Sequence, residues 1–211
     1  MPTAQTASKE KSSSLRERNK QRIHQRLHET AITLLSRTEL EQITIEDICE
    51  GAEISKKTFY NYYPSKHDLI EAISQSLLLD ASRRHFDECM SRFSTTRERL
   101  LCFLQKQGSN LSDKPLLERN LIRHAMLDLS QSSDSSGKKM ENQIQLFEKM
   151  LEAGKQRGEI NPAFSPRFLA EMIDGAINTS AIHWIHFPDY PVNKRYRELK
   201  QFILDIALTP P

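Results

Sequence analysis

The feature that most constrains this chain is a twelve-residue stretch, SKKTFYNYYPSK, at residues 55–66. It holds four aromatic rings and three lysines within a chain of otherwise ordinary composition. A buried segment would not carry three lysines, and a fully solvated loop has no use for four aromatic rings. We therefore expect the stretch to lie half in a core and half against a charged partner.

Helix boundaries can be read on both sides of this stretch. Thr44 followed three residues later by Asp47 resembles a capping box, which predicts a short helix. Ser55 can cap a second short helix, and Pro64 disfavours helical geometry in the residue before it, so this helix ends by Tyr63. Two short helices joined by a tight turn predict a helix-turn-helix.

Helical patterns recur along the rest of the chain, and almost nothing indicates a strand. Apolar spacing predicts a first helix from about Leu15 to Arg37 and a fourth from Lys66 to about Phe93. Further helices are predicted at 96–111, 115–130, 138–157, 166–187 and 193–208, with turn-rich stretches at 130–137 and 187–191. The predicted fold is all-α, with a flexible basic tail (1–14), a helix-turn-helix three-helix module (15–64) and a larger helical bundle (65–211).

Composition narrows the class of protein. A hydrophobic content of 37% is enough to bury a core, and no stretch approaches the roughly 18 apolar residues of a membrane span. The N-terminus lacks the apolar block of a signal peptide, so we expect a cytoplasmic protein without a membrane partner. Cys49, Cys89 and Cys102 form no CxxC pair, and we expect reduced thiols with neither a disulfide nor a metal site.

The net charge of +2 hides an asymmetry. Residues 1–26 carry seven basic and two acidic side chains, which gives +5 there and leaves −3 for the remainder. A basic arm of this kind often binds phosphates by displacing counterions, although a charge run is more often only a solvated surface.

Helical spacing divides the side chains of residues 55–66 between two faces. Phe59 and Tyr63 are four apart and are predicted to face the core. The outer face holds Lys56, Lys57, Tyr60 and Asn61, flanked by Thr58 and Tyr62. Lysine can reach phosphate or guanine, asparagine can bond adenine, and tyrosine can donate to phosphate, so this face suits double-stranded DNA. Lys66, at the start of the next helix, can add a phosphate contact beside backbone N–H groups.

The run TIEDICEGAEISKKTFYNYYPSKHDLIEAI, residues 44–73, resembles the signature of TetR-family transcriptional regulators. The spacing of Ser55, Thr58, Phe59, Tyr60, Tyr63 and Lys66 carries the resemblance. It implies that the DNA-facing residues are Thr44, Ser55, Lys56, Lys57, Thr58, Tyr60, Asn61, Tyr62 and Lys66. Glu53 stands where the family usually has glycine, and a positive φ at Glu53 would cost on the order of 1 kcal/mol.

The resemblance also implies a homodimer that reads a palindromic operator and a repressor that an unknown small molecule relieves, with no cofactor. Apolar lining candidates for that effector are Phe86, Met90, Phe93, Leu101, Leu104, Met126, Phe147, Met150 and Leu151. The last two helices would form the dimer interface, through Met172, Gly175, Ala176, Thr179, Trp184, Leu199, Phe202, Ile203 and Ile206. Trp184 is then either an interface anchor or a pocket wall, and packing in the core or the interface is the simpler expectation.

Other functions find less support. No catalytic constellation or phosphate-cradling loop is recognisable, so we do not expect an enzyme. His24 and His28 are four apart, as metal ligands can be, but without further ligands nearby they are expected to be surface histidines beside DNA. The alternative hypothesis is a helical protein-interaction or enzymatic protein whose N-terminal module is not a DNA reader.

Overall fold

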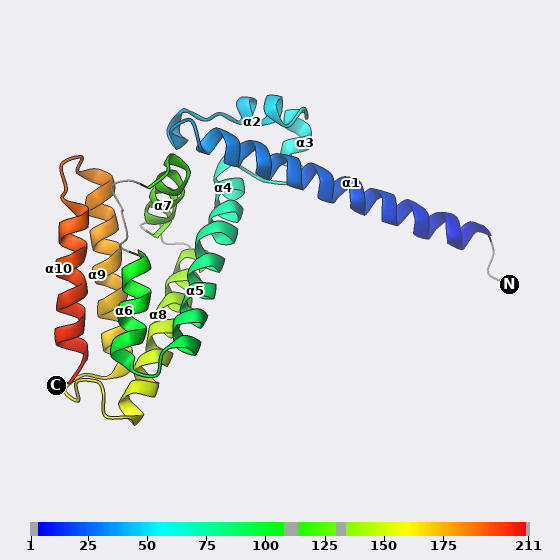
Figure 1. Ribbon diagram of the computed structural model, residues 1–211. Helices are drawn as coiled ribbons and strands as arrows, with labels where there is room; N and C mark the ends of the chain where they lie inside the picture. Colours follow the sequence, from blue (N-terminus) through cyan, green and yellow to red (C-terminus); the bar gives the residue numbers. More distant parts are fainter. Residues whose placement is uncertain (1–3, 108–113, 130–133, 210–211) are drawn as a thin grey trace. The chain divides into compact units, whose positions relative to one another are not determined.

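The computed structural model describes residues 4–107, 114–129 and 134–209, and the regular elements within these ranges are helices (Figure 1). The chain divides into two compact units. The first comprises residues 1–73 together with 115–120, and the second comprises 74–114 together with 121–211. The prediction of an all-α fold is confirmed.

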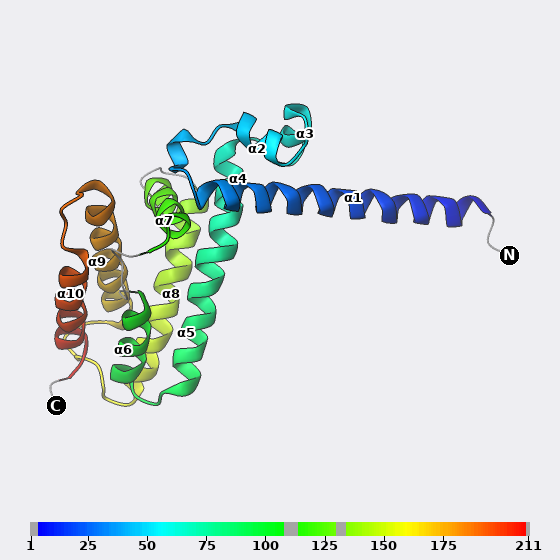
Figure 2. The same cartoon turned by 45° about the horizontal axis from the view of Figure 1, so that its top comes forward.

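The N-terminal unit is built on a long first helix with two short helices packed beside it. It contains α1 (Ala4–Leu35), a 3₁₀ turn (Leu40–Gln42), α2 (Ile45–Gly51), α3 (Lys56–Tyr60) and nearly all of α4 (Lys66–Ser74). Figures 1 and 2 show α2 and α3 side by side next to α1. The buried apolar side chains of this unit are Leu27, Ala31, Leu35, Leu40, Ile43, Ile48, Cys49, Ala52, Phe59, Tyr63, Leu69, Ile70 and Ile73.

The first helix starts earlier than the sequence pattern predicts. It begins at Ala4, whereas apolar periodicity indicates a start near Leu15, so residues 4–14 of the predicted flexible tail are helical. Residues 4–14 lack apolar periodicity but contain no glycine or proline, and Ala, Gln, Lys and Glu are good helix formers. Intrinsic propensity is therefore one reason for helix formation in this segment.

The second unit is a helical bundle. Its elements are a π-helical segment (Gln75–Leu79), α5 (Asp80–Arg92), α6 (Thr96–Gln107), most of α7 (Leu116–Leu129), α8 (Asp134–Gln156), α9 (Pro166–His186) and α10 (Val192–Ala207). Figure 2 shows α9 beside α10, and α8 packs along α9. The predicted turn at 187–191 is confirmed. The predicted turn at 130–137 is only partly described, because residues 130–133 lie outside the described ranges and Asp134 already begins α8.

The apolar residues predicted to line an effector site lie in or beside the core of this bundle. Phe86, Leu104, Phe147, Met150 and Leu151 belong to the buried cluster, and Met90 and Leu101 pack against it. Phe93 and Met126 are half-buried. Ile203, predicted at the dimer interface, is 3% exposed and lies in the same cluster, so its side chain faces inward rather than toward a partner.

The cysteines differ from the expectation of three reduced thiols. Cys89 on α5 and Cys102 on α6 form a disulfide, with Cα atoms 5.9 Å apart, whereas Cys49 is a buried free thiol. The prediction of no disulfide was therefore wrong, because the twelve residues between the two cysteines turn the chain back on itself and place α6 against α5. Among the described residues, no helix has the length and apolar character needed to cross a membrane.

Candidate nucleic-acid interface

The helix-turn-helix begins at the predicted cap. The Thr44 hydroxyl accepts a bond from the Asp47 N–H at 3.1 Å, and the Asp47 carboxylate accepts from the Thr44 N–H at 2.8 Å. These reciprocal bonds make the capping box that the sequence predicts. The Asp47 carboxylate also accepts from the Thr44 hydroxyl, so the two side chains together fix the start of α2.

The third helix, α3, is short, and Ser55 directly before it caps its N-terminus. The Ser55 hydroxyl accepts from the Thr58 N–H at 3.1 Å, which caps α3 as predicted. Phe59 is fully buried, whereas Tyr60 is 52% exposed. Tyr60 packs edge-on against Phe59, with ring centroids 5.5 Å apart. The prediction that one α3 face enters the core while the other stays accessible is confirmed.

The accessible face carries two lysines in different electrostatic settings. Lys56 forms an ion pair with Glu46 of α2, and this bond lowers the pKa of Glu46. Lys57 is exposed, and no ion pair of it occurs within the described residues. Asn61, also exposed, follows the last residue of α3. Because the charge of Lys56 is partly compensated, Lys57 is the stronger candidate for a phosphate or base contact.

Lys66 has a role that the sequence did not indicate. Its ammonium donates to the backbone carbonyl of Leu40 at 3.0 Å and to that of Ile43 at 2.6 Å. These carbonyls belong to the segment that leads into α2, so Lys66 ties the start of α4 to the helix-turn-helix. That Lys66 contacts DNA remains a prediction. In the structure the Lys66 side chain bonds to these two backbone carbonyls.

The end of the aromatic run is anchored to the first helix. The Tyr63 hydroxyl lies 2.6 Å from His24 Nε2 and 2.7 Å from His28 Nε2, so it donates to one ring and accepts from the other. Tyr63 is 7% exposed, and burial raises its pKa to about 12. The prediction that the two histidines are surface groups beside DNA therefore misses their contact with Tyr63. They hold Tyr63, three residues past the end of α3, against α1.

This anchor is expected to make the stability of the N-terminal unit depend on pH. Burial, and secondarily the neighbouring His24, lowers the pKa of His28 below the ordinary histidine value. The unfolded chain therefore binds more protons than the folded chain as pH falls below about 6.5. We expect unfolding, followed by circular dichroism, to require less urea at about pH 5.5 than at about pH 7.5. The loss should be smaller in His28→Gln, and an equal loss in both proteins would contradict this cause.

The turn between α2 and α3 contains the backbone feature expected from the sequence. Glu53 has φ of 49°, the left-handed region where the family usually places glycine. Its carboxylate pairs with Arg26 of α1 at 2.7 Å, but the Glu53 side chain is 84% exposed. Exposed pairs contribute little, so the ion pair offsets only part of a backbone cost of roughly 1 kcal/mol.

Two substitutions at Glu53 separate the backbone cost from the ion pair. Both Glu53→Gly and Glu53→Val remove the carboxylate, but valine is β-branched and disfavours positive φ. We expect Glu53→Val to be less stable than Glu53→Gly by about 1–2 kcal/mol, measured by urea unfolding. Equal stabilities would mean that the turn can adopt another conformation.

A buried amide joins the N-terminal unit from a distant part of the sequence. Asn120, in the first turns of α7, is fully buried. Its side-chain N–H groups donate to the carbonyls of Leu35 and Thr38, both at 2.9 Å. Its side-chain oxygen accepts from the Leu40 N–H at 3.1 Å. One amide thus satisfies backbone groups where α1 ends and the 3₁₀ turn begins, a function that no local sequence pattern indicates.

Comparisons with known proteins agree with this geometry. The family model described as "Bacterial regulatory proteins, tetR family" matches residues 27–73. These residues include α2 and α3, most of α4 and the packed face of α1. The fatty acid metabolism regulator protein of Bacillus subtilis (strain 168) is 22% identical over 161 residues, which cover 74% of this chain and 80% of that protein.

Two solved structures share the fold over most of the chain. FadR of Thermus thermophilus, a TetR-family transcriptional repressor in complex with lauroyl-CoA, has a TM-score of 0.70 and 18% identity, and the match covers 89% of this chain and 96% of that one. FadR of Bacillus subtilis, in complex with stearoyl-CoA, has a TM-score of 0.66 and 19% identity, with 85% and 97% covered. The chain is thus similar to tetR-family regulators over the capped α2–α3 pair, and it shares its helical fold with these two FadR proteins.

Proposed function

We propose that the protein is a homodimeric repressor that binds a palindromic operator through α3 and is released from it by an apolar small molecule. The observation that carries the DNA-reading part is the outward face of α3, where Lys57, Tyr60 and Asn61 stand exposed on a helix anchored by Phe59. A recognition helix uses such side chains to contact base edges in the major groove, and two copies read two half-sites. The protein would act in the cytoplasm, where the chromosome is.

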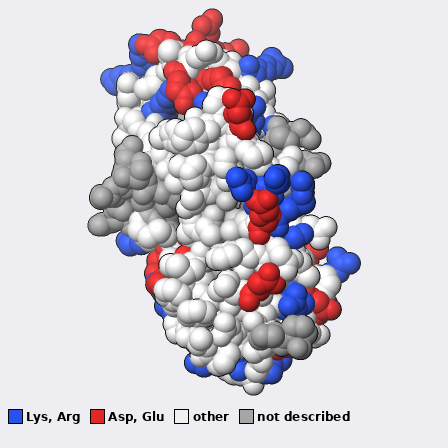
Figure 3. All heavy atoms as spheres, turned by 90° about the vertical axis from the view of Figure 1, so that its left-hand side faces the viewer, with Lys and Arg blue, Asp and Glu red and all other residues white. Residues whose placement is uncertain are grey.

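An exposed apolar face on α9 and α10 supports the homodimer. Large apolar side chains stand exposed at Phe168, Met172 and Ile182 of α9 and at Phe202 and Ile206 of α10. Figure 3 views the side on which these two helices lie, and uncharged side chains form a broad area there, interrupted by a few charged groups. Large apolar side chains exposed together on neighbouring helices are uncommon on a monomer and mark an interaction site.

The spacing along α9 suits close packing of two helices. Phe168, Met172, Gly175, Thr179 and Ile182 follow one another at intervals of four and three residues, so they share one face. At Gly175 an added Cβ would meet nothing within 4 Å, so the backbone is open to a partner there. Two copies of this face would bring four helices together, with Ala176, Trp184 and Leu199 beside the contact.

The effector proposal rests on the apolar interior of the second unit and on the relatives. Seven of the nine lining candidates, all but Phe93 and Met126, are buried in or packed against one cluster, which suits an apolar chain better than a polar ligand. The two FadR proteins were solved with lauroyl-CoA and stearoyl-CoA. We therefore propose a long-chain acyl-CoA as the first effector to test, with Phe86, Met90, Phe93, Leu101, Leu104, Met126, Phe147, Met150 and Leu151 as lining residues.

The DNA-reading proposal predicts selection of a palindromic motif from a randomised duplex pool at roughly physiological salt, where non-specific phosphate binding is weak. Lys57→Ala and Asn61→Ala should each weaken binding to that motif by about 1–3 kcal/mol, because each removes a base or phosphate contact. Lys155→Ala is the matched control, since it removes one exposed lysine from α8 and should leave affinity unchanged.

Two results would overturn parts of this proposal. Failure of the folded, ligand-free protein to enrich any sequence would favour the protein-interaction reading of the N-terminal module. Unchanged operator affinity after addition of lauroyl-CoA or stearoyl-CoA would reject the acyl-CoA effector while leaving DNA recognition intact. An effector must bind the non-DNA conformation more tightly, and a coupling of about 1–3 kcal/mol is typical.

A further inference from the structure

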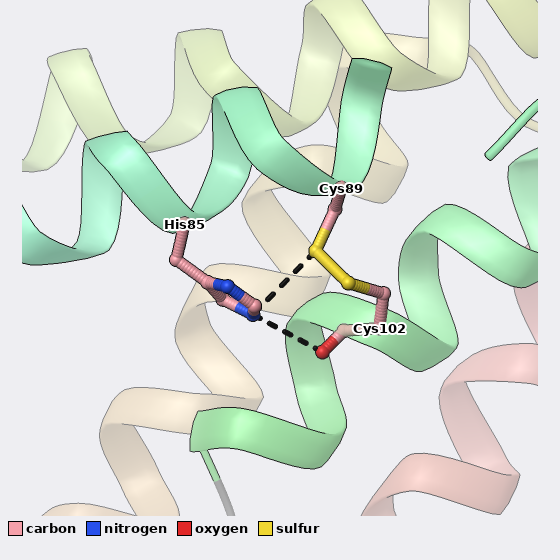
Figure 4. Close-up of side chains that lie close together, drawn as sticks. All are labelled: His85, Cys89 and Cys102. Atoms are coloured by element: carbon pink, nitrogen blue, oxygen red, sulfur yellow. Dashed lines mark hydrogen bonds between the residues drawn. A yellow bond between two sulfur atoms is a disulfide. The ribbon is translucent and has the colours of Figure 1, made fainter. Parts of the chain in front are cut away.

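Three side chains with metal-binding atoms converge in the second unit, outside the residues used for DNA and for dimerisation. His85 and Cys89 lie one helical turn apart on α5, and Cys102 faces them from α6 (Figure 4). Their ligand atoms all lie within 4.8 Å of one another. The Nε2 atom of His85 is 3.5 Å from the Cys89 sulfur and 3.2 Å from the Cys102 carbonyl oxygen.

The surroundings of this cluster match those of a built metal site. Cys89 is fully buried and His85 is 9% exposed. The second ring nitrogen of His85, Nδ1, lies 3.4 Å from a Glu88 carboxylate oxygen, and its ring stacks on Phe103 with centroids 5.9 Å apart. A ligating histidine usually directs its other ring nitrogen to a carboxylate, which fixes the ring and strengthens it as a ligand. Nε2 lies on the side of the Cys89 sulfur and the Cys102 carbonyl, so metal binding would require it to give up its proton and its contact with that carbonyl.

The disulfide is the oxidised form of this cluster. If the protein is a DNA-binding regulator, as proposed above, it works beside the chromosome, where cellular reductants keep most thiols reduced. Under those conditions Cys89 and Cys102 would be a dithiol held 5.9 Å apart between their Cα atoms by the packing of α5 against α6. Two buried or half-buried thiols and an imidazole at this spacing are a chelating set.

We propose that, in the dithiol state, His85, Cys89 and Cys102 bind one soft metal cation of the Zn²⁺ type. The sulfur atoms would separate by side-chain rotation until each lies about 2.3 Å from the metal, with Nε2 at about 2.0–2.1 Å. Binding releases the two thiol protons to solvent and transfers no electron. Water takes the fourth position, because this cluster supplies three ligands.

The ligand set also defines which cations are excluded. Thiolate and imidazole favour Zn²⁺ and similar soft cations, whereas Mg²⁺ and Ca²⁺ require oxygen ligands. Glu88 touches the imidazole and not the sulfur atoms, so it acts as a positioning residue rather than a ligand. Formation of the disulfide consumes both sulfur ligands, so metal binding and the disulfide exclude each other.

The experiment uses the full-length protein, reduced with a phosphine and freed of metal, and titrates Zn²⁺ against a chromophoric chelator in the absence of DNA. We expect one Zn²⁺ per chain and no competition from Mg²⁺. Cys102→Ser should lower the affinity about 100-fold or more, and Glu88→Gln about tenfold. The same protein loaded with Co²⁺ should show thiolate-to-metal charge-transfer absorption, which a merely structural role of the cysteines would not produce.

Two controls keep the test independent of folding and of DNA binding. Cys49→Ala removes a thiol from the other unit and should bind Zn²⁺ as the wild type does. Oxidation of the wild type with diamide, which takes two electrons and two protons from the thiols, should abolish metal binding without any substitution. Absence of Zn²⁺ binding by the reduced protein, or undiminished binding by Cys102→Ser, would overturn the site and leave the DNA-reading proposal untouched.

Discussion

Phe202→Asp is expected to convert the proposed dimer into a monomer and to reduce operator affinity by at least about 100-fold. Phe202 is 58% exposed on α10, the most exposed of the large apolar side chains in the described chain. A single carboxylate at this position would have to lose its hydration without a partner when two copies meet, which costs several kcal/mol. The two recognition helices of a dimer read the two half-sites of a palindrome, so a monomer contacts only one half-site.

Sedimentation and DNA titration would measure the two effects of Phe202→Asp on one preparation. Lys194→Asp is the control, because it places the same carboxylate on α10 where the wild-type side chain is a 67% exposed lysine. Neither change should alter the unfolding free energy of the monomer by more than about 0.5 kcal/mol, since both sites are at the surface. A dimer that persists in Phe202→Asp would place the interface elsewhere.

Asn120→Asp is expected to destabilise the N-terminal unit by about 3–5 kcal/mol at neutral pH. The change keeps the shape of the side chain but replaces its two N–H donors with oxygen. The new carboxylate would be fully buried and would face the carbonyls of Leu35 and Thr38, which it cannot bond. A buried charge without a partner is among the most costly single substitutions.

Unfolding of Asn120→Asp would be followed by circular dichroism for all helices and by fluorescence of Trp184, the only tryptophan, for the second unit. We expect the circular dichroism transition to shift to lower urea, and the capped α2–α3 pair to lose its support at the end of α1. Asn142→Asp makes the same chemical change on an exposed site of α8 and should be nearly neutral. Equal stabilities of the two variants would show that α7 does not anchor the first unit.

The difference between Lys57 and Lys66 illustrates how far local reasoning reaches. Both are lysines at the predicted DNA-facing surface, and the sequence assigns them similar roles. In the structure Lys57 is exposed on α3, whereas Lys66 donates to two carbonyls of the segment before α2. Helical spacing predicts the face from which a side chain leaves the helix. A long lysine side chain can nevertheless turn back to any acceptor within its reach.

The sequence by itself determined the elements whose causes are local. The capping box at Thr44, the cap at Ser55 and the burial of Phe59 each depend on residues within one or two turns, so spacing and side-chain chemistry predict them. The resemblance over residues 44–73 rests on the same local pattern.

Only the tertiary structure decided the contacts that close long loops. Asn120 reaches backbone groups about eighty residues earlier in the chain, Tyr63 bonds two histidines of α1, and Cys89 meets Cys102 across two helices. Such contacts depend on which helix faces pack together, and apolar periodicity specifies a face without naming its partner. The amide at Asn120 and the thiols on α5 and α6 therefore acquire their roles from the packing of the folded chain.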